Sequence, residues 1–254
     1  MTGYTALLLA GSRPGGDPFA ERYGAEMKAL IPLAGEPMVL RPLRALLASK
    51  QVDAVRLLTQ SPDRIAAALP ASGRWSVEPS AGTIAETIER IADDERTRWP
   101  LLVTTADHAL LDEGMIGQFC LEAEGADLAI GVVAQSALMK RLPQTRRTWI
   151  GFRRGKYTGA NLFAFGSPKA MKAVALWREV EQDRKKGWRL LLALGWPGLL
   201  GLLRLRTLDQ TLAAMGRKLG LSLRAVRLEN PLAAVDVDKP SDYDLVTDIL
   251  DRRA

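Results

Sequence analysis

The regular alternation of short apolar runs with segments of helical periodicity is the feature that most constrains the fold of this chain. Apolar runs of strand length occupy residues 5–10, 54–59, 75–78, 100–105 and 128–133. Helical patterns lie between them, at residues 38–49, 63–69, 84–94 and 113–124. Short strands that alternate with helices are typical of parallel sheets. We therefore expect an α/β fold: a mostly parallel, twisted, Rossmann-like sheet with helices on both faces.

The second half of the chain is less regular. Residues 146–166 predict paired strands joined by a Gly-containing turn, and residues 167–184 predict a helix. A last strand at 222–228 leads into a closing helix, for which we expect Ser241 as the N-cap. No repeat or linker is visible, so we expect a single domain of all 254 residues with a small, hydrophobic, helical insertion at 185–219.

The composition indicates which kinds of ligand and which cellular compartment suit this chain. Lys and Arg total 35 against 29 Asp and Glu, and the net charge of +6 favours anionic ligands such as nucleotides, phosphorylated metabolites or acidic lipid surfaces. The basic residues are dispersed without interleaved stacking aromatics, so nucleic acid is not an expected partner. Cys120 is the single cysteine, which excludes an intrachain disulfide and fits a reducing cytoplasm. The apolar run at 4–10 is too short to span a membrane and lacks the basic flank of a signal peptide.

A glycine-containing loop follows the first predicted strand. It holds Gly11, Gly15 and Gly16, and Lys28 comes after it. Ligands of such sheets bind outside the carboxyl ends of the strands. Glycines let backbone amides approach an anion closely, and a lysine ammonium is a mobile charge at a phosphate site. The loop is neither a Walker loop nor G-x-G-x-x-G, and the alternatives are a simple strand-to-helix turn and a solvated lysine.

Acidic side chains follow two further strand-like segments. Asp107 lies in LLVTTADHALL at 101–111, where a carboxylate suits Mg²⁺ and the alternative is a helix cap. Asp236 and Asp238 alternate in AVDVDKPSD, so an extended chain places them on one side as a second ligand set; the alternative is stabilisation of the next helix N-terminus. His108, the single histidine, is expected in a loop and pointing away from Asp107. No G-x-S-x-G pattern accompanies it, so a serine hydrolase is not expected.

Together these features resemble the MobA-like nucleotidyltransferase superfamily, whose members have the nucleotide-binding GT-A fold. LLLAGSR followed by KALIPLAGEPM is similar to the family pattern L-A-G-G-x-x-x-R…K-x-L-x-P-L-x-G-x-P-x. The similarity continues in SAGTIAETI, TTADHALL and VDVDKPSDYDLV, the last of which is similar to D-x-D-T-P-E-D-L. Order and spacing agree over residues 4–134 and 222–250, with partial similarity in TGANLFAFG. Each motif is degenerate, but the ordered set is specific.

The resemblance implies a role for residues in each motif. Arg13 and Lys28 would neutralise the triphosphate and form the catalytic set with Asp107. Mg²⁺ would be held by Asp107 and Asp238, with Asp236 as a close competitor for the second position. The implied nucleotide-binding residues are Leu9, Ala10, Gly11, Ser12, Ser80, Gly82 and Thr83. The implied acceptor-binding residues are Gly159 and Asn161.

Two departures from the family pattern affect these assignments. The usual double glycine is Gly11-Ser12 here, and the loop before Lys28 is longer than is typical, so Arg13 need not align with the family arginine. The family D-x-P is Asp107-His108-Ala109, which keeps the carboxylate and removes only a turn residue.

The function that the resemblance implies is Mg²⁺-dependent transfer of a nucleoside monophosphate from a nucleoside triphosphate onto a phosphorylated acceptor, with release of pyrophosphate. An acceptor phosphate is ionised at neutral pH, so catalysis needs alignment and charge neutralisation without a general base. CTP is the favoured donor, because lipid and polyol precursors are often activated that way in similar families. The alternatives are a molybdopterin-type guanylyl- or cytidylyltransferase, a sugar-transferring GT-A enzyme and a non-catalytic nucleotide-binding membrane adaptor.

Residues 188–203, WRLLLALGWPGLLGLL, are almost wholly apolar and have basic residues on both sides. Such a segment suits peripheral contact with the inner membrane face through residues 188–206, in which case the acceptor would be a lipid or polyprenyl precursor with a phosphate head. The uncharged run is shorter than the roughly 20 residues of a spanning helix, so a transmembrane helix is not expected. The alternative is a pair of short helices buried on the domain or in a homodimer contact.

Overall fold

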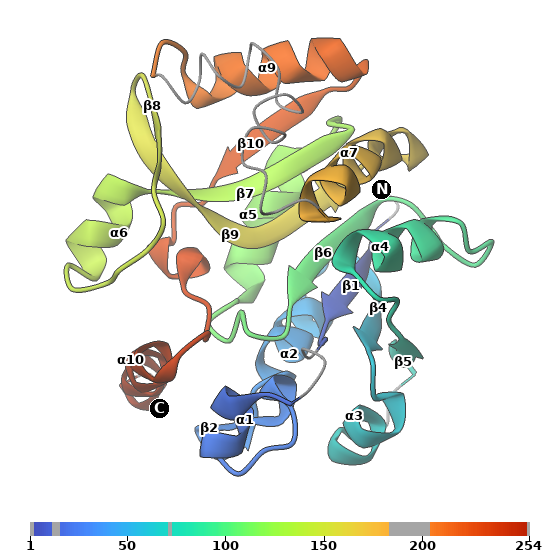
Figure 1. The fold of residues 1–254 in the computed structure, drawn as a ribbon, viewed down its shortest axis with the longest axis vertical. Helices are drawn as coiled ribbons and strands as arrows, with labels where there is room; N and C mark the ends of the chain where they lie inside the picture. The colour runs from blue at the N-terminus through green and yellow to red at the C-terminus, as the bar shows by residue number, and fades with distance from the viewer. Residues whose placement is uncertain (1–2, 12–15, 71–72, 183–203, 253–254) are drawn as a thin grey trace.

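The computed structural model describes residues 3–11, 16–70, 73–182 and 204–252. Its centre is an 8-stranded sheet in the order β10-β7-β9-β6-β1-β4-β5, with β8 paired to β9 at the side (Figure 1). The strands of this sheet are β1 (Tyr4–Leu9), β4 (Val52–Thr59), β5 (Trp75–Pro79), β6 (Leu101–Thr105), β7 (Leu128–Ala134), β8 (Ile150–Phe152), β9 (Gly155–Phe165) and β10 (Leu223–Arg227). A small separate sheet pairs β2 (Pro32–Leu33) with β3 (Glu36–Pro37).

Most neighbouring strands run parallel. β1 pairs in parallel with β4 and β6, β4 pairs with β5, and β7 pairs with β10. β9 is the exception, because it lies antiparallel between β6 and β7 and forms the expected hairpin with β8. The mostly parallel α/β fold predicted from the alternating apolar runs is confirmed.

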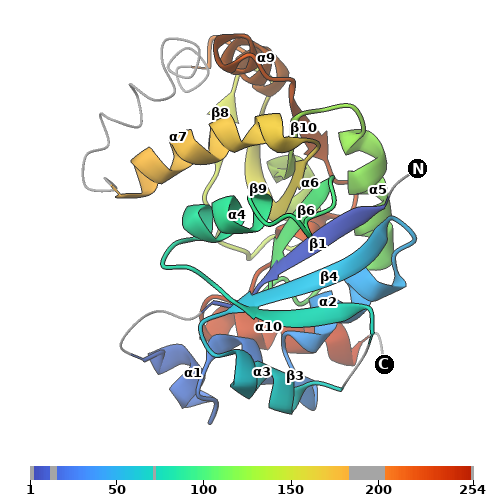
Figure 2. The ribbon, with the colours of Figure 1, turned by 90° about the vertical axis from the view of Figure 1, so that its right-hand side faces the viewer.

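Helices cover both faces of the sheet, and Figure 2 shows α4 and α7 above the strands, with α2 and α10 below them. The helices are α1 (Pro18–Arg22), α2 (Leu40–Ala48), α3 (Pro62–Ala68), α4 (Ile84–Ala92), α5 (Glu113–Ala123), α6 (Gln135–Arg141), α7 (Met171–Gln182), α9 (Leu208–Leu219) and α10 (Pro240–Asp251). The described residues also form three short 3-10 turns: η1 (Lys28–Leu30), η2 (Pro168–Ala170) and η3 (Pro231–Ala234).

The period of two along β1 divides its side chains between two cores. Ala6 and Leu8 pack in the larger cluster, which includes residues of α2, α5 and α10. Leu7 packs on the opposite face with residues of α4 and α7. Successive side chains of a strand point to opposite faces, so a continuous apolar run is what a strand covered on both sides requires.

The N-cap predicted for the closing helix is wrong. α10 begins at Pro240, and the residue before it, Lys239, occupies the cap position without a side-chain hydrogen bond. Proline suits the first position of a helix because it has no N–H to satisfy. Asp242 in the first turn instead accepts a hydrogen bond from the Asp238 N–H at 3.2 Å. This contact holds the segment before the helix in place.

Most of the expected insertion at 185–219, including the apolar segment 188–203, lies outside the described residues. Its last part forms α9, where Leu208 packs with Val132 of β7 and Ala225 of β10. None of the helices in the described ranges combines the length and apolarity needed to cross a bilayer. The insertion as a separate unit and its contact with a membrane or a second subunit stay predictions.

Candidate active site

A pocket opens at the edge of the sheet where β1, β4 and β6 end. Its volume is about 620 Å³, within the range of small-molecule sites. Leu9, Leu58 and Thr105, which lie at or next to the ends of these strands, contribute to its wall. Ligands of open α/β sheets bind at this edge, so the pocket is the candidate active site.

Most residues that the sequence singles out around a nucleotide line this pocket. They are Leu9, Gly11, Lys28, Ser80, Gly82, Thr83, Asp107 and Asp238. Ala10 is buried, 1% exposed, and its N–H donates to the Leu58 carbonyl at 2.8 Å. Ser12 and Arg13 lie outside the described residues.

The side chain of Lys28 extends between two carboxylates. Its Nζ lies 2.6 Å from Oδ2 of Asp107 and 2.5 Å from Oδ1 of Asp238. Burial lowers the pKa of Lys28, but the charges and hydrogen bonds of the two aspartates outweigh it and raise the pKa above its usual value. Lys28 is therefore charged at neutral pH, and the three side chains form one ionic cluster in the pocket wall.

Hydrogen bonds on either side of the ionic cluster bring the two aspartates together. Asp107 follows β6, and the Thr105 hydroxyl donates to its Oδ1. The Val237 N–H donates to the Asp107 carbonyl at 3.1 Å, which ties the segment before α10 to the end of β6. Asp238 is the next residue and is held through its N–H by Asp242. Backbone hydrogen bonds, rather than the ionic contact alone, thus define the distance between the carboxylates.

The implied Mg²⁺ fits this pair of carboxylates. Asp107 and Asp238 converge on one cation, the Lys28 ammonium, and carboxylate oxygens are the ligands that Mg²⁺ prefers. Within the described part of the chain, no group of three or more His, Cys, Asp or Glu side chains is placed to hold a metal ion. Mg²⁺ commonly takes one or two protein carboxylates and completes its shell with water and substrate phosphates. The donor set therefore suits a metal that arrives with a nucleotide.

Asp236 faces a different partner. Its Oδ1 pairs with Nη1 of Arg147, and Nη2 of Arg147 donates to its carbonyl at 3.2 Å. The Asn161 Nδ2 donates to Asp236 Oδ2 at 3.3 Å. Asp236 and Asp238 alternate in the chain, yet one is neutralised by Arg147 and the other by Lys28. Nothing local in the sequence identifies Arg147, which precedes β8 by only a few residues.

The two residues implied in acceptor binding lie on β9. Gly159 is exposed and pairs with Val132 of β7. Asn161 has φ 47°, in the left-handed region, beside a register irregularity between Ile130 and Val132. Asparagine tolerates this conformation better than most residues. The bulge directs the Asn161 amide to Asp236, close to the segment that carries Asp238.

The turn from β5 into α4 forms another part of the pocket wall. Thr83 caps α4, and a capping box joins it to Glu86 at 3.1 Å and 3.0 Å. A Cβ on Gly82 would lie 3.0 Å from Glu86 Oε2, so glycine suits this turn. The Ser80 hydroxyl is buried and has no hydrogen-bond partner among the described residues. It is a polar atom at the pocket that a nucleotide can satisfy.

Sequence reasoning missed several residues of the pocket: Asp17, Phe19, Leu58, Gln60, Thr87, Thr105 and Ala106. Gln60 directly follows β4, so the rule that ligands bind at strand ends predicts its position. A Cβ on Gly11 would lie 3.2 Å from its Nε2, which places this amide against the glycine loop. Asp17 caps α1 by accepting from the Phe19 N–H at 3.0 Å.

His108 is buried in the turn after β6. It is 1% exposed, and its Nδ1 lies 3.4 Å from the Thr104 hydroxyl oxygen. Burial lowers its pKa from 6.5 to about 4, although Asp107 and Asp112 act in the opposite direction. The imidazole is therefore neutral at physiological pH and packed away from the pocket, in agreement with the direction expected from its position after Asp107.

We expect His108 to make the protein less stable as the pH falls from about 6.5 to about 4. In this window the unfolded chain binds a proton that the buried imidazole does not, so the free energy of unfolding decreases by up to about 3 kcal/mol. Denaturant unfolding at about pH 7 and about pH 4.5 measures the loss. His108→Leu should remove this part of the pH dependence, and an unchanged dependence in the variant would contradict the assignment.

The family described as MobA-like NTP transferase domain matches residues 6–215. A hypothetical transferase of Thermus thermophilus is 32% identical, and the match covers 95% of this chain and 99% of that one, with a TM-score of 0.80. No curated protein sequence matches the chain.

Two more distant solved structures share the fold. CMP:2-keto-3-deoxy-manno-octonic acid synthetase, complexed with CTP, is 12% identical, with 99% of this chain and 100% of that chain covered and a TM-score of 0.64. The 4-diphosphocytidyl-2C-methyl-D-erythritol synthase of Anaerococcus prevotii is 11% identical, with 99% and 97% covered and a TM-score of 0.60. At these identities the similarity concerns the fold alone.

Proposed function

Because the chain belongs to the family of MobA-like NTP transferase domains and is a nucleotidyltransferase, we propose that it transfers a nucleoside monophosphate, CMP in preference, from the triphosphate to a phosphorylated acceptor. Pyrophosphate is the second product. The observation that carries this proposal is the cluster of Lys28, Asp107 and Asp238 in a pocket of nucleotide size at the carboxyl ends of the strands.

The lysine and the two aspartates of the cluster would have different electrostatic roles. The Lys28 ammonium is a mobile charge that can leave the carboxylates and pair with phosphate oxygens when a nucleotide enters. Asp107 and Asp238 would then hold Mg²⁺. A bound Mg²⁺ supplies charge neutralisation on the triphosphate. Lys28 would stabilise the charge that develops on pyrophosphate as the bond to the α-phosphorus breaks.

The acceptor needs no protein base. Its phosphate is ionised at neutral pH and can attack the α-phosphorus directly, so positioning is the main requirement. His108 could not serve as a base in any case, since it is buried with a pKa lowered to about 4. We place the acceptor on the side of β9, where Asn161 and Arg147 meet Asp236 next to the segment of Asp238. Gly159 leaves room there, because a Cβ on it would meet nothing within 4 Å.

The preference for CTP rests on the two distant structures, whereas the pocket supports the binding of a base and ribose in general. The two distant structures of the same fold are named for CTP or a diphosphocytidyl product. The buried Ser80 hydroxyl, without a partner among the described residues, and the glycine positions Gly11 and Gly82 offer close polar contacts to a base and ribose.

A thermal-shift panel with ATP, CTP, GTP and UTP, each with and without Mg²⁺, tests the proposal without knowledge of the acceptor. A ligand that binds only the folded state raises the melting temperature by mass action. We expect the largest shift with CTP and a requirement for Mg²⁺. Pyrophosphate release in the presence of phosphorylated polyols or polyprenyl phosphates then identifies the acceptor. No shift with any nucleotide would contradict the proposal.

Replacement of Gly11 by alanine should weaken nucleotide binding about tenfold. The new Cβ would lie 3.2 Å from Gln60 Nε2 and 3.3 Å from its Oε1, so the amide must shift, and both residues line the pocket. The dissociation constant from calorimetric titration checks this. Gly73→Ala is the matched control, because a Cβ there meets nothing within 4 Å. Equal affinities of the two variants would show that the glycine loop does not contact the nucleotide.

A further inference from the structure

A second hollow lies where the β8–β9 hairpin meets the start of α9. Its volume is about 270 Å³, and among the described residues it shares no lining residue with the candidate active site. In Figure 1 the hairpin and α9 occupy the upper end of the molecule, whereas α1, beside the nucleotide pocket, is near the lower end. The hollow is therefore a separate site.

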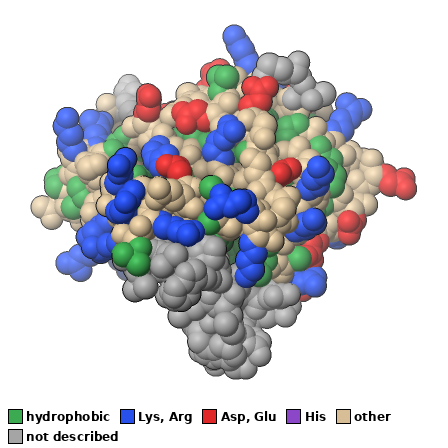
Figure 3. All heavy atoms as spheres, turned by 90° about the horizontal axis from the view of Figure 1, so that it is seen from above, with side chains coloured by type: hydrophobic (Ala, Val, Ile, Leu, Met, Phe, Trp, Pro, Cys, Tyr) green, Lys and Arg blue, Asp and Glu red, His purple; other side chains and the backbone are tan. Residues whose placement is uncertain are grey.

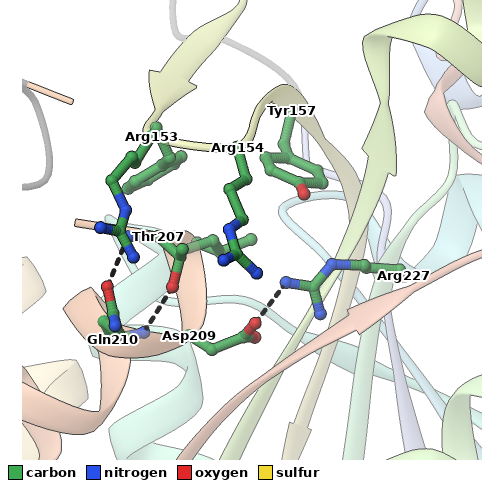
Figure 4. Close-up of a pocket in the computed structure, with 9 residues that line it drawn as sticks. Arg153, Arg154, Tyr157, Thr207, Asp209, Gln210 and Arg227 are labelled. Carbon is green, nitrogen blue, oxygen red and sulfur yellow. Dashed lines mark hydrogen bonds and ion pairs between the residues drawn. The ribbon is translucent and has the colours of Figure 1, made fainter. Parts of the chain in front are cut away.

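Arginines dominate the lining of this hollow. Arg227 pairs with Asp209 at 2.6 Å, and its guanidinium lies 5.4 Å from the centroid of the Tyr157 ring. Arg153 and Arg154 have no carboxylate partner within the described part of the chain. Figure 4 shows the Arg154 side chain reaching between Tyr157 and Asp209, and the Arg153 side chain directed toward the start of α9. Asp209 is the one acid among the described lining residues and is already neutralised by Arg227, so the hollow carries an excess positive charge.

Contacts between the hairpin and the segment that leads into α9 shape the hollow. The Arg153 N–H donates to the Arg206 carbonyl at 2.9 Å, which joins the turn of the hairpin to the segment before α9. The Arg204 guanidinium packs over Gly151, where a Cβ would lie 2.7 Å from its Nε. Thr207 caps α9 with a capping box. The positive end of the 12-residue helix dipole adds to the charge of the arginines.

Two exposed apolar side chains lie on the chain segments next to the hollow. Ile150 is 47% exposed and is the β8 partner of Tyr157, and Leu205 is 60% exposed and follows Arg204 in the chain. Figure 3, which looks down on the end of the molecule that carries α9, shows Lys and Arg side chains over much of this face. Arginines that bind phosphate beside exposed apolar side chains suit the boundary between an anionic lipid head group and its acyl chains.

We propose that this hollow binds the phosphate group of an anionic ligand. The exposed side chains of Ile150 and Leu205 favour a phospholipid head group at a membrane surface as the source of this phosphate. The guanidinium groups of Arg153 and Arg154, which pair with no carboxylate among the described residues, make the contacts, since planar arginine forks suit phosphate oxygens. This site goes beyond nucleotidyl transfer and does not depend on it.

Co-sedimentation of the full chain with vesicles tests the lipid source. We expect binding to vesicles that contain phosphatidylglycerol and none to pure phosphatidylcholine. Arg153→Gln/Arg154→Gln should weaken binding at least about tenfold, because each basic residue near an anionic surface contributes to affinity. Arg217→Gln/Lys218→Gln removes the same charge from the exposed far end of α9 and should bind like the wild type.

A second arm uses inorganic phosphate and a thermal-shift readout on the same proteins. Suppose that phosphate stabilises the wild type and the control more than the Arg153→Gln/Arg154→Gln protein, and that vesicles do not bind. The site then holds a soluble phosphorylated ligand. Equal behaviour of the two double variants in both arms would overturn the proposal. So would a wild type that binds neither vesicles nor phosphate. Nucleotide-induced stabilisation of the double variant provides a check on its folding and is expected to be unchanged.

Discussion

Asp107→Asn should lower kcat/KM for pyrophosphate release by at least about a hundredfold, with little change in the fold. The amide keeps the size of the side chain and can still accept from the Thr105 hydroxyl. It removes the negative charge that lies 2.6 Å from Lys28 Nζ and one of the two carboxylates proposed to hold Mg²⁺. Because the loss concerns charge neutralisation in the transition state, kcat should fall more than KM rises.

Asp248→Asn is the matched control for this experiment. It makes the same chemical change on the exposed surface of α10, outside the residues that line the pocket. Its turnover should equal that of the wild type. Melting temperatures of both variants separate loss of activity from loss of folding. Wild-type turnover in a folded Asp107→Asn protein would show that this carboxylate takes no part in the reaction.

Lys28→Met should lower turnover about as much as Asp107→Asn does. In the free protein, however, it should strengthen the binding of Mg²⁺. Methionine keeps an unbranched side chain but removes the ammonium between Asp107 and Asp238. We expect a loss of about a hundredfold or more in kcat/KM, since Lys28 is proposed to stabilise the charge on the leaving pyrophosphate. Without the ammonium, the two carboxylates repel each other and are open to a divalent cation.

Mg²⁺ alone, without nucleotide, provides the second readout for Lys28→Met. The melting temperature should rise with added Mg²⁺ more in the variant than in the wild type, where the lysine competes for the same carboxylates. Lys172→Met, on the exposed surface of α7, is the control and should respond like the wild type. Identical Mg²⁺ responses of the variant and the wild type would contradict the placement of the metal between Asp107 and Asp238.

The family and the sheet were predictable because their signals are local or ordered along the chain. The apolar runs at 54–59, 100–105 and 128–133 correspond to β4, β6 and β7 within a residue or two. The match to the MobA-like NTP transferase domain over residues 6–215 confirms the resemblance seen in the ordered motifs. The place of β9 between β6 and β7 was not predictable, because strand order depends on how distant segments pack.

The sequence predicted which residues belong to the candidate site better than it predicted which of them contact each other. Strand-end position and glycine content singled out Lys28 and Asp107, which line the same pocket. The alternation of Asp236 and Asp238 suggested one shared ligand set, yet the fold gives each a different cationic partner. The prediction of Ser241 as the helix cap was wrong. A proline stands at the first helical position and has no N–H to satisfy, and the acidic side chain of Asp242 in the first turn accepts from the Asp238 N–H.

The sequence by itself determined the α/β class, the covered faces of the sheet and the side chains available for phosphate and metal chemistry. These follow from hydrophobic period and residue type, which act over a few neighbouring residues. Only the tertiary structure decided that Lys28 meets both Asp107 and Asp238, because these residues are 79 and 210 positions away from it in the chain. It likewise decided that Arg147 reaches Asp236, 89 positions away, and that Arg153 and Arg154 stand unpaired beside α9 within the described residues. Convergence of this kind depends on the packing of whole strands and helices, which no short stretch of sequence encodes.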